Sequence, residues 1–264
     1  MSKKKKVRRF PVFLVVLSVY LLLPFFVTLV YSLFTDWTGI LPTGFTFHNY
    51  ELLVGDGEFW SSIGRTFLVS ILSVALTIAV LLLVMYVVVA VWPKLGKWIG
   101  IISMIPYALQ GVILSIGIVS MYSGTNLILS DRMVMLFGAY SILVLPYIYQ
   151  SIRNNLNSIP ATTMMQAASL LGCGPFRAYW RILVPNIIPG ILVSSVLAVS
   201  IIFGDFVLAN NIAGTNYQNI QVYLFRKMSV SSGLSSAIVV VIFLVVLLTT
   251  GLLVYFQSKQ RKEE

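Results

Sequence analysis

Six stretches of the chain are long, apolar and almost free of charged residues, and they constrain the fold more than any other feature. Each has 20 to 30 residues, and only Arg65 and Asp205 interrupt them. A helix needs about 20 apolar residues to cross the hydrocarbon core of a bilayer. The sequence therefore predicts an all-α integral membrane protein with six transmembrane helices, at residues 10–34, 63–92, 98–122, 133–152, 186–209 and 233–256.

The positively charged residues gather on one side of this predicted topology. Of the 18 Lys and Arg residues, 14 lie before the first span, after the last, or in the connections that follow the second and fourth spans. Such an excess marks the cytoplasmic side. We expect a basic cytoplasmic N-terminus at 1–9, a single transmembrane domain at 10–256 and a cytoplasmic tail at 257–264. The net charge of +10 then orients the protein in the membrane and does not indicate nucleic-acid binding.

The polar residues exclude several classes of site. A single cysteine, Cys173, permits neither an internal disulfide nor a cysteine metal cluster, and a single histidine, His48, permits no multi-histidine metal site. No GxxxxGK[ST] sequence is present, so the chain has no phosphate-binding loop of that type for ATP. We expect no catalytic residues, metal or cofactor in this chain.

One polar segment, Gln166 to Pro189, lies between the predicted fourth and fifth spans, on the cytoplasmic side. Thr163 fits a helix N-cap with Gln166 three residues on, which is a capping box. Gly172 fits the left-handed residue that ends a helix, and Pro175 fits the first turn of a second one. The sequence therefore predicts two short helices in a coupling loop at 160–189.

The second of these helices has one apolar side. Phe176, Tyr179, Trp180 and Leu183 recur at helical spacing, while Arg177 and Arg181 lie off that stripe. An amphipathic connector of this kind can lie on lipid headgroups. It can also be a structured docking site for a soluble protein.

The order of residues in this loop resembles the EAA loop of permease subunits of binding-protein-dependent ABC importers. That pattern is E-A-A-x-x-x-G-A, an aromatic residue seven positions after the Gly, and then L-P-x-x-x-P. Here Gln166-Ala167-Ala168 is followed in register by Gly172-Cys173, Tyr179, Val184-Pro185 and Pro189. Gln166 replaces the family's Glu, and Cys173 replaces its Ala. Pro160, the segment 45–50 and the segment 106–111 also look like family elements.

The resemblance implies an energy-coupling role. In such importers the first short helix of the loop binds a groove of a cytoplasmic ATPase pair, which carries the ATP and magnesium. A second permease subunit, expected here to be a different chain, completes the pathway, and an extracytoplasmic solute-binding protein delivers the solute. The membrane would be the prokaryotic cytoplasmic membrane. Carried over by position, the coupling residues are Gln166, Ala167, Ala168, Gly172 and Phe176.

Asp205 is the only acidic residue within a predicted span, and a charge at membrane depth must face protein or water. It is either a hydrogen-bonded residue at the edge of the fifth span or part of the translocation path. Asn210, Asn211, Tyr107 and Gln110 are further path candidates, although single polar residues also hold helices together. Phe203-Gly204-Asp205 resembles the fifth span of permeases for polyamines, phosphonates, iron and thiamine, and a carboxylate would suit a cationic polyamine.

The segment 210–232 is polar and too long for a tight turn, so we expect a structured external loop. It is either a solvated connector or a contact for the binding protein, with Arg226 and Lys227 as candidates.

Two functions are compatible with these features. The first is the permease subunit of an ATP-driven importer. The second is a secondary transporter that uses Asp205 for ion coupling, which leaves the segment from Gln166 to Pro189 unexplained.

Overall fold

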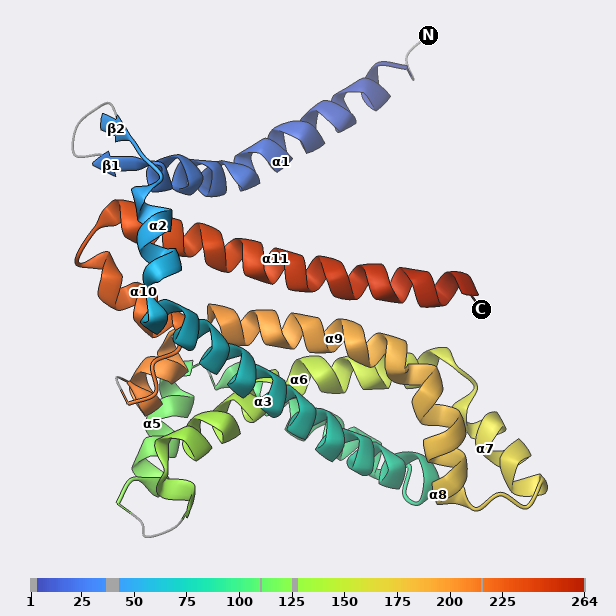
Figure 1. Cartoon of the computed structure of the whole chain (residues 1–264). Helices are drawn as coiled ribbons and strands as arrows, with labels where there is room; N and C mark the ends of the chain where they lie inside the picture. The colour runs from blue at the N-terminus through green and yellow to red at the C-terminus, as the bar shows by residue number, and fades with distance from the viewer. Residues whose placement is uncertain (1–3, 37–42, 110, 125–127, 215, 264) are drawn as a thin grey trace. The chain divides into compact units, whose positions relative to one another are not determined.

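The computed structural model describes residues 4–36, 43–109, 111–124, 128–214 and 216–263 of the chain. Nearly all of the described chain is helical (Figure 1). Five helices are long and apolar enough to cross a membrane, and a sixth span results when the bent pair α4 and α5 is counted as one. The prediction of a helical protein with about six spans is thus confirmed in its coarse form.

A first compact unit comprises residues 1–59 and 224–245. It holds α1 (Lys4–Ser32), β1 (Phe34–Asp36), β2 (Thr43–Phe45), α2 (His48–Gly55), the end of α10 (Ile220–Met228) and the start of α11 (Ser232–Glu263). The antiparallel pair β1–β2 departs from the predicted all-α fold. Phe34 pairs with Phe45 across it, with ring centroids 5.8 Å apart, and such cross-strand aromatic pairs stabilise short ladders.

A second compact unit comprises residues 60–223 and 246–264. Its helices lie in the order α3 (Gly57–Ala90), α4 (Leu95–Ala108), α5 (Gly111–Tyr122), η1 (Ile128–Ser130), α6 (Arg132–Ser158), α7 (Ala161–Leu170), α8 (Pro175–Ala178), η2 (Tyr179–Leu183), α9 (Val184–Gly204) and η3 (Ala209–Ala213). The most extensive packing between its elements is that of α6 against α9.

The close approach of α6 and α9 depends on Gly190. The Ser151 hydroxyl on α6 donates a hydrogen bond to the Gly190 carbonyl oxygen at 2.8 Å. A Cβ atom at Gly190 would overlap the side-chain amide of Asn155. Ile148, Ile152 and Ile187 are fully buried and belong to the same hydrophobic core. A residue without a side chain therefore sets the distance at which these two helices pack.

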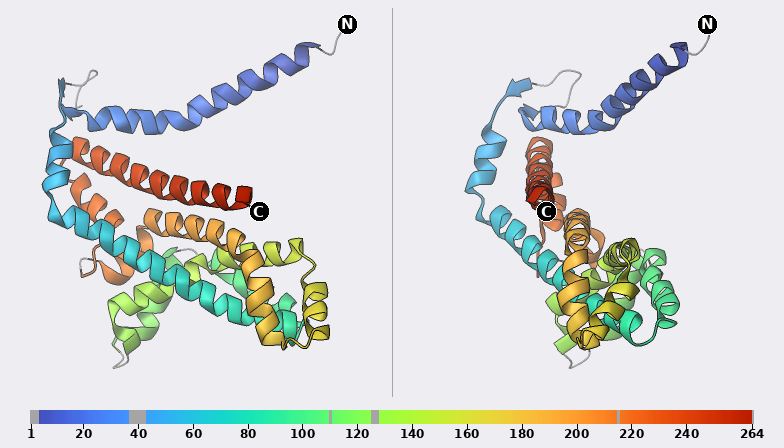
Figure 2. Two further views of the ribbon diagram at one scale, coloured as in Figure 1. Left: turned by 45° about the vertical axis from the view of Figure 1, so that its right-hand side comes forward. Right: turned by 90° about the vertical axis from the view of Figure 1, so that its right-hand side faces the viewer.

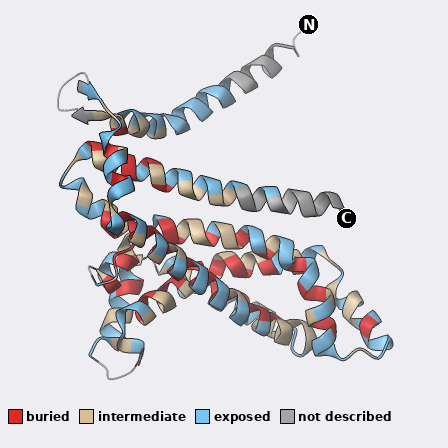
Figure 3. Ribbon diagram, viewed as in Figure 1, coloured by how far each residue is buried: buried red, intermediate tan, exposed pale blue. Residues whose placement is uncertain are grey.

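The outer sides of the helices carry many exposed apolar residues (Figure 3). Between Phe13 and Ser32 of α1, only Ser32 is buried, and over half of the apolar window of α3 is not buried either. Soluble monomers rarely expose contiguous apolar surface of this extent. In a bilayer, lipid chains cover such a surface.

The third span, predicted at 98–122, is divided between two helices. The structure has α4 and α5 inclined at 100° to each other, an arrangement that fits a broken span or a re-entrant loop. Pro106 lies in the last turn of α4 and supplies no N–H, and Leu109 leaves the helical region with φ −93° and ψ 82°. The proline and the glycine at the start of α5 therefore separate two helices within the predicted span.

The fifth span also differs from its predicted boundaries of 186–209. It is helical from Pro175 to Gly204, and its ribbon bends between α8 and α9 (Figures 1 and 2). The Val184 N–H bonds to the Tyr179 carbonyl oxygen, which makes η2 a π-helical turn. This wider turn ends directly before Pro185, whose ring would clash with a carbonyl of an ordinary α-helix. The helix therefore continues through a proline that we expected to mark its start.

Candidate functional site

The loop between α6 and α9 lies at the end of the second unit where α3 runs into α4 (Figures 1 and 2). It contains the short helix α7, whereas the second predicted helix, which begins at Pro175, continues through α8, η2 and α9 to Gly204. Glycines and a cysteine separate them, and Pro175 occupies the first turn of α8. The local geometry therefore follows from residues that were visible in the sequence.

The end of α7 is a Schellman motif. Gly172 has φ +76°, the Gly172 N–H bonds to the Ser169 carbonyl oxygen at 3.0 Å, and the Cys173 N–H bonds to the Ala168 carbonyl oxygen at 3.0 Å. These two bonds satisfy carbonyl groups that a helix end leaves open. The chain reverses sharply here, and the end of α7 is fixed by backbone bonds.

The predicted start of α7 was wrong. Thr163 is not an N-cap, because the helix begins at Ala161 with Pro160 in the capping position and no side-chain capping bond. The Met164 N–H bonds to the Pro160 carbonyl oxygen, so Thr163 already lies inside the helix. Proline is favoured at the start of a helix because its fixed φ is already close to the helical value.

The second helix is fixed to α3 by Tyr179. This residue is fully buried, and its hydroxyl donates a 2.8 Å hydrogen bond to the Leu82 carbonyl oxygen. Tyr86 on α3 stacks edge-on against both Tyr179 and Phe176, at 5.4 Å between ring centroids in each case. Arg177 and Arg181 are exposed. The apolar stripe of this segment therefore packs on protein, whereas the headgroup alternative would place it on lipid.

The opposite side of the loop carries apolar residues without cover. Leu170 and Leu171 are 89% and 88% exposed at the end of α7, and Gln166 and Ala167 are exposed beside them. We call these four residues the α7 tip. Exposure of two neighbouring leucines to water is unfavourable. Burial of each side chain would contribute about 2 kcal/mol of stabilisation.

At the other end of α9, Asp205 is the first residue beyond the helix. One oxygen, Oδ2, accepts hydrogen bonds from the Leu208 N–H at 3.0 Å and the Ala209 N–H at 3.4 Å, and from the Tyr140 hydroxyl at 3.3 Å. The two backbone bonds are those of a helix N-cap. Asp205 therefore starts the helical segment that contains η3.

Asn219 links Asp205 to the start of α10. Its side-chain amide donates to the Asp205 carbonyl oxygen at 3.2 Å and to the Tyr140 hydroxyl at 3.3 Å, and its Oδ1 accepts from the Val222 N–H at 2.8 Å. Asn219 and Tyr140 are buried. A small polar network thus joins α6, the end of α9 and the loop that follows.

Tyr217 fastens the same loop to α3. Its hydroxyl donates to the Arg65 carbonyl oxygen at 3.2 Å, and the Arg65 guanidinium lies over its ring at 5.9 Å. Burial raises the pKa of Tyr217, while the nearby Arg65 charge acts in the opposite direction. The hydroxyl stays protonated at neutral pH and remains a donor.

Residues 52–262 match the family described as "binding-protein-dependent transport system inner membrane component". The chain belongs to this family of ABC importer permeases. The match includes the loop with its Schellman turn, the buried Tyr179 and the Asp205 network. No group of three or more His, Cys, Asp or Glu side chains in the described part of this permease could hold a metal ion.

Curated relatives of the permease include transport proteins for two kinds of solute. It is 24% identical over 220 residues to the putative 2-aminoethylphosphonate transport system permease protein PhnV of Salmonella typhimurium, covering 80% of this chain and 79% of the relative. It is 23% identical over 220 residues to the probable starch degradation products transport system permease protein AmyC of Thermoanaerobacterium thermosulfurigenes, covering 80% and 78%.

A solved structure has the same fold. The permease resembles a chain in the crystal structure of a bacterial ABC transporter involved in the import of the acidic polysaccharide alginate, with a TM-score of 0.66 and 15% identity. The likeness covers 97% of this chain and 98% of the other.

The predicted coupling residues of the permease fall into two groups. Gln166 and Ala167 lie in the α7 tip, and Gly172 supplies the turn beside it. Ala168 is buried instead, and Phe176 is 57% exposed while it contacts Tyr86. The structure places all five residues in one loop but turns only some of them outward.

The predicted path residues differ in their surroundings. Asp205 and Asn211 each bond within the protein, Asn211 to the Ser115 hydroxyl at 2.9 Å, and Asn210 is exposed. Tyr107 lies on α4, where its ring packs against that of Tyr147 with 5.1 Å between the ring centroids. Gln110 lies outside the described residues.

The two candidate binding-protein contacts occupy the last turn of α10, within the first unit. Lys227 forms an ion pair with Asp56 at 3.3 Å, and Arg226 forms a longer one with Glu58 at 3.8 Å. The described part of the segment 210–232 includes most of η3 and all of α10.

Four residues of these sites were not predicted from the sequence. Leu170 and Leu171 were not singled out, because two leucines that end a short helix do not by themselves show that both are exposed. Tyr140 and Asn219 were missed because their partners are 65 and 14 residues away from them in the chain. A buried asparagine before an amphipathic helix is an N-cap signal that we did not use for Asn219.

Proposed function

We propose that this chain is one of two permease subunits of an ATP-driven importer in a prokaryotic cytoplasmic membrane, with both termini in the cytoplasm. A cytoplasmic ATPase pair binds the α7 tip and carries the ATP and magnesium. An external binding protein supplies the solute, and a different permease chain completes the pathway. The family membership supports an importer and argues against a secondary transporter that uses Asp205.

One observation carries the coupling proposal. The α7 tip presents two leucines to water while Tyr179 bonds the adjoining helix to the backbone of α3. Burial of the exposed leucines of the α7 tip in a groove of another protein would lower the free energy. A tip fixed to two spans passes a displacement to them, which a loose loop would not do. Gln166 in place of Glu removes an ionic contact from this interface. The affinity of the α7 tip for the ATPase therefore rests on the two leucines and on Ala167.

The solute is better proposed as a phosphonate than as a polyamine. The polyamine idea depended on an open carboxylate at Asp205, and that carboxylate caps a helix and accepts a tyrosine hydroxyl. One curated relative is named for 2-aminoethylphosphonate and another for starch degradation products. We therefore propose a small phosphonate, with a sugar as the second candidate.

The remaining site residues have roles in this proposal that follow from their places in the predicted topology. Asp205, Asn210, Asn211, Tyr107 and Gln110 are candidates for the translocation path. Arg226 and Lys227 are candidates for contacts with the binding protein, because their loop follows the fifth span on the external side.

The test of coupling is the variant Ala167→Glu in the assembled transporter. A carboxylate in the α7 tip should abolish most solute-stimulated ATP hydrolysis without loss of assembly. Ser158→Glu, an exposed position at the end of α6, is the matched control and should behave like the unmodified protein. Normal ATP hydrolysis by Ala167→Glu in an assembled complex would show that the α7 tip is not the ATPase contact.

The test of the solute is uptake in cells that express the complete system. Labelled 2-aminoethylphosphonate should accumulate, and unlabelled putrescine in excess should not compete. Accumulation of labelled putrescine without accumulation of labelled 2-aminoethylphosphonate would restore the polyamine prediction.

A further inference from the structure

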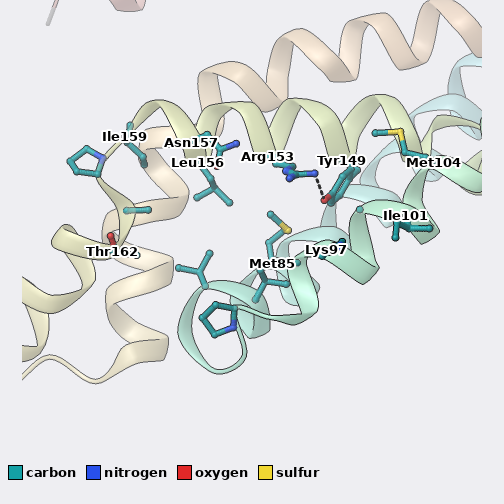
Figure 4. Close-up of a pocket in the computed structure, with 17 residues that line it drawn as sticks. Met85, Lys97, Ile101, Met104, Tyr149, Arg153, Leu156, Asn157, Ile159 and Thr162 are labelled. Atoms are coloured by element: carbon teal, nitrogen blue, oxygen red, sulfur yellow. Dashed lines mark hydrogen bonds between the residues drawn. The ribbon is translucent and has the colours of Figure 1, made fainter.

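A cavity of about 920 Å³ lies at the end of the second unit where α3 runs into α4 and α6 runs into α7 (Figure 4). Its volume is within the range of sites for small molecules, which is about 300–1,000 Å³. Pro160, Ala161 and Thr162 line it, so the start of the α7 helix forms part of its wall. By the distribution of positive charge, this is the cytoplasmic end of the spans.

Two cations face this cavity, and neither has a counter-ion within the described ranges. Arg153 comes from α6 and Lys97 from the first turn of α4, and none of the 17 lining residues is acidic (Figure 4). The ion pairs found among the described residues involve neither of them. Both residues are exposed to solvent. Two like charges that line one cavity repel each other, and an anion bound between them would relieve that repulsion.

A buried hydroxyl points to the same space. Tyr149 is 1% exposed, and its hydroxyl accepts a hydrogen bond from Arg153 Nη1 at 3.4 Å. Because the oxygen accepts this bond, its own hydrogen is left to donate, and it has no acceptor among the described residues. Gly100 makes the space for both groups, since a Cβ atom there would lie 2.9 Å from Tyr149 Oη and 3.2 Å from Arg153 Nη1.

The rest of the wall is apolar. Met85, Val88, Ile101 and Met104 come from α3 and α4, and Leu156 comes from α6. A cationic site with a tyrosine donor and an apolar wall suits an anionic headgroup attached to a hydrocarbon chain. Basic pockets between membrane helices at the cytoplasmic level bind lipid phosphates by this combination of contacts.

We propose that this cavity is a binding site for a phosphate- or phosphonate-type oxyanion, held by Lys97, Arg153 and the Tyr149 hydroxyl. Two sources of that group reach this end of the spans: the headgroup of an anionic phospholipid and a free phosphonate or phosphate in the cytoplasm. The inference goes beyond the proposed transport role and needs no nucleotide, so binding can be measured whether or not the α7 tip couples to an ATPase.

The experiment is native mass spectrometry of the full chain, purified with the subunits it assembles with. In the lipid arm, phosphatidylglycerol and phosphatidylcholine are titrated separately into delipidated protein. In the soluble arm, inorganic phosphate or 2-aminoethylphosphonate is titrated without lipid. Lys97→Gln, Arg153→Gln and Tyr149→Phe are compared with Lys94→Gln, which removes a charge from the same connection but not from the cavity wall. Thermal unfolding confirms that each variant is folded.

We expect one anion to bind the unmodified protein and the affinity to fall about tenfold in Lys97→Gln and in Arg153→Gln, with a smaller loss in Tyr149→Phe. Lys94→Gln should bind like the unmodified protein. If the cavity variants lose affinity for phosphatidylglycerol alone, the site binds lipid. If they lose affinity for phosphate or 2-aminoethylphosphonate in the soluble arm, the site binds the free oxyanion. Equal binding by Lys94→Gln and the cavity variants in both arms would overturn the proposal.

Discussion

The Tyr179 hydroxyl donates a 2.8 Å hydrogen bond to the Leu82 carbonyl oxygen, and this bond joins the loop after α6 to the backbone of α3. The two residues are 97 positions apart. Buried hydroxyl groups need such partners, because an unsatisfied donor costs free energy when water is absent. The contact fixes η2, and with it the adjoining α8, against α3.

Tyr179→Phe removes this bond and leaves the ring in place. We expect the free energy of unfolding to fall by about 1 kcal/mol, measured by denaturant or thermal unfolding in detergent. Tyr86→Phe is the matched control, because the Tyr86 hydroxyl has no hydrogen-bond partner among the described residues, and its stability should not change. If both variants unfold like the unmodified protein, the Tyr179 bond does not form in the membrane protein.

Gly172→Ala tests the turn that ends α7. Gly172 has φ +76°, and a Cβ atom there would meet nothing within 4 Å, so any effect comes from the backbone. An alanine at a left-handed position costs about 1–2 kcal/mol. Gly174→Ala is the control, since Gly174 has φ −62° and an equally open surrounding. Limited proteolysis of the loop should be faster in Gly172→Ala only; equal cleavage of the two variants would contradict the assigned turn.

Gly190→Ala tests the contact of α9 with α6. A Cβ atom must displace the Asn155 amide, which donates a 2.8 Å bond to the Ser151 carbonyl oxygen. We expect a loss of about 1 kcal/mol. The double variant Gly190→Ala with Asn155→Ala should lose little more than Asn155→Ala alone, because the displaced group is then absent. Simple additivity of the two losses in thermal unfolding would mean that the residues do not touch.

Asp205→Asn separates the charge of this residue from its capping role. Asparagine caps helices as well as aspartate does, whereas alanine costs about 1 kcal/mol. We expect Asp205→Asn to assemble normally with altered solute uptake, and Asp205→Ala to lose stability as well. Asn210→Ala, at a neighbouring exposed position, is the control for stability. Unchanged uptake by Asp205→Asn would leave Asp205 as a structural cap alone.

Much of the helical structure followed from the sequence because the length of an apolar stretch is a local property. The predicted spans reappear with shifts at particular prolines. Pro185 suggested a helix start, but the π turn before it accommodates the ring. Pro106 lay inside one predicted span, but the helix ends soon after it, before Leu109. A proline limits the backbone without deciding between a bend, a break and a wider turn.

The coupling loop was predictable to a similar degree. Gly172 and Pro175 have strong backbone preferences, and both occupy the positions expected for them. Thr163 was wrongly predicted as the N-cap because threonine is common at that position. The neighbouring sequence does not show that Pro160, three residues earlier, is the N-cap instead. The cavity near Lys97 and Arg153 was not predicted, because these residues are 56 positions apart and meet only when α4 packs on α6.

The π-helical turn at Tyr179–Leu183 makes the number of residues in this segment important. A π turn holds one residue more than an α turn, so it behaves like a single-residue insertion within a helix. Removing one residue there would restore a regular helix and rotate everything before it by roughly 100° about the axis of α9. Tyr179 would then face away from Leu82, and the leucines of α7 would point in a new direction. The loop thus tolerates changes of side chain more readily than changes of length.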